Sequence, residues 1–145
     1  MNLIFRNPRT AFAAAVMVAG MLAGSANAAD AGATMVKLSG SQEVPAVETA
    51  ASGSGKITVG ADKSVSGSVT TYGIAGTMAH IHQAAPGHNG SVIIPLQQAA
   101  ANVWSVPAGA KLTDEQYKSY KAGDLYVNVH SKAHPDGEIR GQLKP

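Results

Sequence analysis

From Thr34 to Leu143 the chain consists of short runs in which apolar and polar side chains alternate, separated by glycine, proline, serine and asparagine. A two-residue period matches a β-strand, because successive side chains of a strand point to opposite faces. Short runs divided by turn residues indicate antiparallel strands in a sandwich or barrel. The chain is therefore predicted to be all-β, an antiparallel Greek-key β-sandwich or barrel with one short helix.

The alternation predicts about eight strands. They are expected at residues 34–39, 54–59, 64–72, around His80, and at residues 91–96, 103–106, 124–130 and 138–143. The helix is expected at residues 113–122, where Thr113 and Gln116 form a capping box and Gly123 ends the helix. No cysteine occurs, so no disulfide stabilises the fold and its stability depends on the core.

The first 28 residues have the three parts of a secretory signal peptide. Arg6 and Arg9 make a cationic start, residues 11–23 are an apolar run, and residues 25–28 are small. A transmembrane anchor is the alternative, but the run is shorter than the roughly 20 residues that a span needs. We predict a signal peptide at residues 1–28 and one domain at residues 29–145, in a periplasmic or secreted protein with no membrane span after cleavage.

Removal of that segment also changes the charge. The chain has 11 Lys and Arg and 9 Asp and Glu, and the loss of Arg6 and Arg9 leaves equal numbers of the two signs. The basic isoelectric point therefore partly reflects the leader, and we expect no nucleic-acid partner.

Three of the five histidines lie within residues 78–90. His80 and His82 are two residues apart, so both point to one face of a strand while their apolar neighbours point to the other. The same alternation applied to the last two strands places a second polar face opposite an apolar one. This face carries Tyr126, Asn128, His130, Glu138, Arg140 and Gln142.

Imidazole nitrogen is a common ligand for copper, zinc and nickel, and we predict a metal site at His80, His82 and His130. His88 and His134 lie in predicted turns, where they could complete the ligand set or face solvent. Around the site, Glu138 is expected to orient an imidazole and Arg140 to attract a small anion, with Asn128 and Tyr126 beside them. The alternatives are a solvated polar face and a surface ion pair between Glu138 and Arg140.

Three segments together resemble the chordin-type CHRD domain: QEVP at residues 42–45, AHIH followed by PGHNG in the middle, and DLYVNVHSKAHPDGEIRGQL at the end. The resemblance covers residues 34–143. It implies an extracytoplasmic β-rich domain, repeated in the animal developmental regulator chordin and alone in many secreted bacterial proteins. It implies no particular reaction.

The chain is also distantly similar to copper–zinc superoxide dismutase, a Greek-key β-barrel. That likeness implies copper ligands at His80, His82 and His130 and a guiding charge at Arg140. The chain departs from that enzyme in having no cysteine and no zinc subsite of several histidines with an aspartate.

These observations leave three hypotheses open. The first is an exported CHRD protein that binds a transition metal, copper ahead of zinc, for copper handling or a redox-related role. The second is a metal-free module that binds an extracytoplasmic protein partner. The third is a minimal enzyme of the superoxide dismutase type. We expect no other catalytic residues and no organic cofactor, because the chain has no G-x-S-x-G elbow, no cysteine nucleophile and no glycine-rich phosphate loop.

Overall fold

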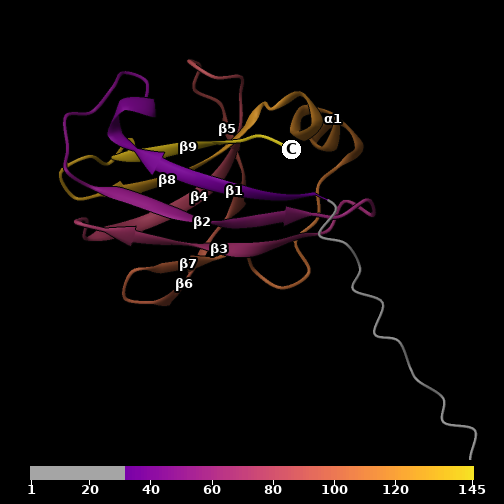
Figure 1. The fold of residues 1–145 in the computed structure, drawn as a ribbon, viewed down its shortest axis with the longest axis horizontal. Coiled ribbons are helices and arrows are strands. Elements are labelled where there is room, and N and C mark those ends of the chain that lie inside the picture. Colours follow the sequence, from indigo (N-terminus) through magenta and orange to yellow (C-terminus); the bar gives the residue numbers. More distant parts are fainter. Residues whose placement is uncertain (1–31) are drawn as a thin grey trace, which may run out of the picture.

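The computed structural model describes residues 32–145 (Figure 1). The predicted signal peptide at residues 1–28 lies outside them. The described part contains nine strands, one α-helix and one 3-10 turn. They are β1 (Ala33–Ser39), η1 (Gly40–Gln42), β2 (Ser52–Val59), β3 (Val65–Tyr72), β4 (Gly76–Gln83), β5 (Ser91–Pro95), β6 (Gln97–Ala100), β7 (Val103–Ser105), α1 (Asp114–Ala122), β8 (Leu125–Ser131) and β9 (Ile139–Leu143).

All nine strands form one antiparallel sheet in the order β5-β4-β8-β9-β1-β2-β3-β7-β6. Its two outermost strands, β5 and β6, are separated only by Leu96. One continuous run, residues 91–100, therefore pairs with β4 at one end of the sheet and with β7 at the other. The sheet curls into a nearly closed barrel, as Figure 1 shows. The predicted all-β antiparallel class is confirmed.

The core fills the inside of this barrel. The apolar residues of the alternating pattern point inward from strands around the sheet, and their side chains are almost fully buried. Examples are Val36, Leu38, Ile57, Val69, Ile81, Val127, Val129, Ile139 and Leu143. Because the chain has no disulfide, this packed interior is the main source of its stability.

The helix α1 lies beside the sheet (Figure 1) and has the predicted ends. The Thr113 side chain accepts a hydrogen bond from the Gln116 amide, the Gln116 side chain caps the Thr113 amide, and Gly123 ends the helix in the left-handed conformation. Tyr120 is buried, and its hydroxyl donates to the Gly32 carbonyl 2.9 Å away. The helix therefore packs on the core through Tyr120 and the partly buried Tyr117.

The strand β6 was not predicted. Its sequence, Gln-Gln-Ala-Ala, has no alternation, and all four residues are exposed. It is extended because it pairs with β7, and this partner cannot be identified from its own residues.

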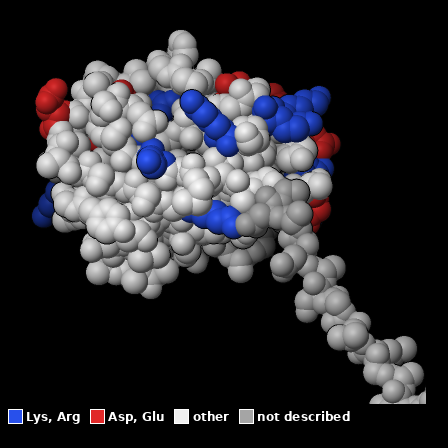
Figure 2. Space-filling model, in the orientation of Figure 1, with Lys and Arg blue, Asp and Glu red and all other residues white. Residues whose placement is uncertain are grey.

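The surface mixes the two signs of charge. On the face drawn in Figure 2, blue and red side chains lie among a mostly uncharged surface. Within residues 32–145, no helix has the length and apolar character needed to cross a bilayer.

Candidate metal centre

The three candidate ligands lie on two neighbouring strands. The strands β4 and β8 pair in antiparallel register, and the residues that face each other on the polar side alternate with buried apolar ones such as Ala79 and Ile81. The facing pairs on the polar side are Met78 with His130, His80 with Asn128, and His82 with Tyr126. Residues directly and diagonally opposite on one face of a sheet can touch, so this register brings both strands' histidines together.

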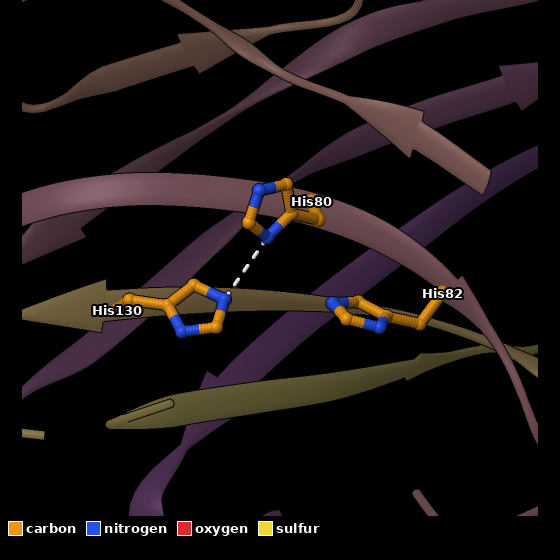
Figure 3. A group of neighbouring side chains, drawn as sticks. All are labelled: His80, His82 and His130. Atoms are coloured by element: carbon orange, nitrogen blue, oxygen red, sulfur yellow. Dashed lines mark hydrogen bonds between the residues drawn. The ribbon is translucent and has the colours of Figure 1, made fainter. Parts of the chain in front are cut away.

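The imidazoles converge. The ring of His80 lies 4.9 Å from that of His130 and 5.5 Å from that of His82, measured between centroids. His80 Nδ1 is 3.0 Å from His130 Nε2, and one nitrogen from each of the three rings lies within 4.8 Å of the others. Figure 3 shows the ring of His82 beside the other two, with a nitrogen directed toward them.

These separations suit a single metal ion. Two nitrogens bound at about 2.0–2.1 Å to one ion lie at most about 4.2 Å apart. The closest pair satisfies this limit, and the widest separation in the group, 4.8 Å at most, exceeds it by about 0.6 Å.

Two of the rings are held by backbone carbonyls. His130 Nδ1 donates to the Pro135 carbonyl at 2.8 Å, and His82 Nδ1 donates to the Gly90 carbonyl at 3.0 Å. The bond to Pro135 places the His130 ring proton on Nδ1, so His130 Nε2 keeps its lone pair. His130 Nε2 therefore accepts a hydrogen bond from His80 Nδ1. His82 faces an acceptor on both sides, because its Nε2 lies 3.1 Å from Asn128 Oδ1, and a metal bound at Nε2 would replace that contact. Histidines that bind metals are commonly oriented by such a bond on the opposite nitrogen.

The surroundings favour neutral imidazoles. Burial lowers the pKa of His80, and the neighbouring His130 and His82 lower it further. Burial also lowers the pKa of His82, against hydrogen bonds to Gly90 and Asn128 that raise it. Because only the neutral ring offers a lone pair to a metal, the lowered pKa values of His80 and His82 favour metal binding near neutral pH.

A stack of side chains supports His82 from below. Its ring lies parallel to that of Tyr126, 4.8 Å away, and the Arg140 guanidinium lies 3.5 Å from the Tyr126 ring centre. The strand β8 lies between β4 and β9, so Tyr126 separates Arg140 from His82. Asn128 Oδ1 is 3.1 Å from His82 Nε2 and borders the position that a metal would take.

The polar face is buried rather than solvated. Arg140 is only 1% exposed, and Tyr126, Asn128 and Glu138 are also buried. Two segments, residues 40–51 and 84–90, cover the face. Arg140 donates to the Ala85 carbonyl and to Asn89, whose amide donates to the Val44 carbonyl. The alternative of a solvated polar face is therefore wrong for these residues, because sequence alternation separates two faces but does not show which loops fold over one of them.

Glu43, which the sequence analysis did not select, lies in the layer between the polar face and the segments 40–51 and 84–90, here called the covered layer. Its side chain is 7% exposed, and one carboxyl oxygen has no hydrogen-bond partner among the described residues. Burial raises its pKa to about 7, although the Arg140 charge and a hydrogen bond from Asn128 lower it. Gly137 makes room for Glu43, since a Cβ at that glycine would lie 2.7 Å from the carboxyl oxygen.

The remaining predicted residues lie away from the three imidazoles. His88 is exposed in its turn, and His134 is half-buried beside Glu138. Glu138 accepts a hydrogen bond from Thr49 at 2.7 Å. Hydrogen bonds to Ser131 and Thr49 and the nearby His134 lower the pKa of Glu138, although burial opposes them. The structure thus joins His80, His82 and His130 with Asn128 and Tyr126, and places Glu138, His88 and His134 outside that group.

The chain matches one family model. The model of the CHRD domain covers residues 34–143, which include every strand from β2 to β9 and the whole imidazole cluster. None of the curated proteins compared matches the chain. No solved structure matches it either.

Proposed function

The chain belongs to the CHRD domain family, and from this premise we propose that it is an exported protein whose three histidines bind a transition-metal ion, copper ahead of zinc. The observation that carries the proposal is the convergence of three imidazole nitrogens within 4.8 Å. The bond from His130 Nδ1 to the Pro135 carbonyl leaves the His130 Nε2 lone pair directed toward the cluster, which supports a role as a ligand.

Copper is favoured by the chemistry of the ligands. Affinity for a given nitrogen site rises along the first-row divalent metals to copper and is lower for zinc. The group of His80, His82 and His130 contains no carboxylate, so it does not favour calcium or magnesium. The half-buried His80 leaves the site open on one side for the ion to enter.

The proposed role is copper handling, in which the protein binds the ion outside the cytoplasm and releases it to another acceptor. A catalytic role of the dismutase kind has less support. Arg140, the candidate guiding charge, is buried on the far side of Tyr126 from His82 and does not face an anion that approaches the imidazoles.

Metal titration followed by calorimetry tests the proposal. The full chain should bind one Cu(II) per molecule, and His80→Ala and His82→Ala should each weaken the affinity by about a hundredfold or more. Loss of a residue that only hydrogen-bonds to a metal ligand already lowers metal affinity about 10- to 100-fold. His88→Ala is the matched control, because His88 is an exposed histidine outside the cluster. Equal affinities for the wild type, both cluster variants and the control would refute the proposal.

A protein-interaction module is the second candidate, and one feature favours it. Tyr72 is exposed at the rim of a hollow of about 490 Å³ formed by β1 and β2 with the end of β3. This candidate predicts a melting temperature that neither copper nor zinc changes. A metal that binds the native protein would raise it in proportion to the logarithm of the ion concentration. Thermal unfolding with and without each ion therefore separates the two.

A further inference from the structure

We propose that Met78 is a fourth ligand of the site and that its thioether sulfur makes the site competent to hold Cu(I). This inference rests on the proposed function, since it concerns the same ion and the same three histidines. It adds a ligand and names the oxidation state of copper that the protein can carry.

The register of the sheet carries the inference. Met78 lies two residues before His80 on β4, so it points to the same polar face, and it is paired directly with His130 on β8. Side chains paired in this way have Cβ atoms about 4.5–5.5 Å apart. Met78 and His82 therefore flank His80 on either side along the strand. Met78 is thus a neighbour of both His80 and His130, whose nitrogens lie 3.0 Å apart.

The environment of Met78 does not suit an ordinary packing role. The residue is 49% exposed, although it is one of the large apolar side chains of the chain. The neighbouring apolar positions, Ala79 and Ile81, point to the opposite face and into the core. A half-exposed methionine gains little from burial, and its flexible side chain is free to turn toward an ion held by His80 and His130.

The ligand type decides the metal. Thioether sulfur is a soft ligand that favours Cu(I), whereas zinc sites in proteins use thiolate, imidazole and carboxylate. Three imidazoles alone bind Cu(II) and Zn²⁺ well. The addition of a sulfur shifts the preference toward the reduced ion.

X-ray absorption at the copper edge of the Cu(I)-loaded full chain tests the assignment directly. The chain has no cysteine, so a sulfur neighbour of copper has to come from a methionine. Wild-type protein should show one sulfur neighbour besides the nitrogens, and Met78→Leu should lose it. Met35→Leu is the matched control, because Met35 is 73% exposed on β1, away from the cluster, and this variant should keep the sulfur signal.

Competition with a Cu(I)-specific chelator measures the effect on affinity. Met78→Leu should lower the Cu(I) affinity by about tenfold or more and leave the Cu(II) affinity within about twofold, since loss of a ligand costs at least what loss of an outer partner does. A nitrogen-only spectrum for the wild type, or equal Cu(I) affinities for Met78→Leu and the wild type, would overturn the inference while leaving a histidine site intact. Absence of copper binding by the wild type would instead remove the proposed function together with the inference.

Discussion

Glu43 is the residue whose replacement most directly tests the covered polar layer. Its carboxyl lies under the segment at residues 40–51, beside Arg140 and Asn128, and burial raises its pKa from 4.5 to about 7. Replacement by glutamine keeps the size of the side chain and removes the charge. We predict that Glu43→Gln is more stable than the wild type above neutral pH and equally stable near pH 4.5.

The sign of this stability difference follows from proton binding by Glu43. Between pH 4.5 and 7 the folded protein holds a proton on Glu43 that the unfolded chain has released, so the free energy of unfolding falls as the pH rises through this window. A rise of the Glu43 pKa from 4.5 to about 7 corresponds to about 3 kcal/mol of unfolding free energy. Glu43 borders two hollows of about 270 Å³ each, through which water screens its charge, so we expect about 1–2 kcal/mol.

Urea unfolding in the presence of a chelator measures this difference, at several values from about pH 4.5 to 8. The lowered pKa values of His80 and His82 change stability in the opposite direction, but they act equally in both proteins and cancel in the comparison. Glu48→Gln is the matched control, because Glu48 is exposed in the same segment. If the free energies of the wild type and Glu43→Gln stay parallel across this range, the carboxyl does not lie in the buried layer described.

Two further predictions concern Gly137 and the imidazoles. Gly137→Ala should lower the free energy of unfolding by about 2–4 kcal/mol, as measured by thermal or urea unfolding. The φ of +130° is strained for alanine, and the new Cβ would lie 2.7 Å from the Glu43 carboxyl. Gly87→Ala, at a φ of +80° with nothing within 4 Å, should cost only about 1 kcal/mol, and equal losses would contradict the packing argument. Copper affinity should stay constant down to about pH 6.5 and fall below it, because burial lowers the pKa values of His80 and His82. Titrations at three pH values check this, and a fall that begins well above pH 6.5 would count against neutral, preorganised rings.

Most of the fold follows from local patterns. A two-residue period, turn residues and one capping box predict eight of the nine strands and the helix to within a few residues. The exception, β6, is extended only because β7 pairs with it. The sequence of residues 97–100 has no pattern that predicts a strand or identifies this partner. The closure of the barrel through residues 91–100 is missed for the same reason.

The site is predictable only in part. The spacing of His80 and His82 places them on one face, and the alternation of β8 places His130 on a polar face as well, so the three candidate ligands were identifiable. Their meeting depends on the register between β4 and β8, which the sequence does not state. The hydrogen bonds that orient these rings go to the Pro135 and Gly90 carbonyls. Every residue has a backbone carbonyl, so the sequence does not show which one will accept such a bond. Glu43 is hidden for a related reason, because its partners lie far along the chain.

The covered layer explains how a site of three imidazoles can exist before any metal arrives. Carbonyls of two turns fix the rings of His82 and His130, and Tyr126 supports one of them from the face opposite Arg140. These contacts are made by the protein alone. In small zinc domains the ion supplies the folding free energy, so the apo form is unfolded. Here the barrel core supplies it, and binding therefore does not have to offset the entropy of ordering the ligands. The copper-handling role proposed above requires this property, because such a protein has to keep its shape while it is empty and while it is loaded.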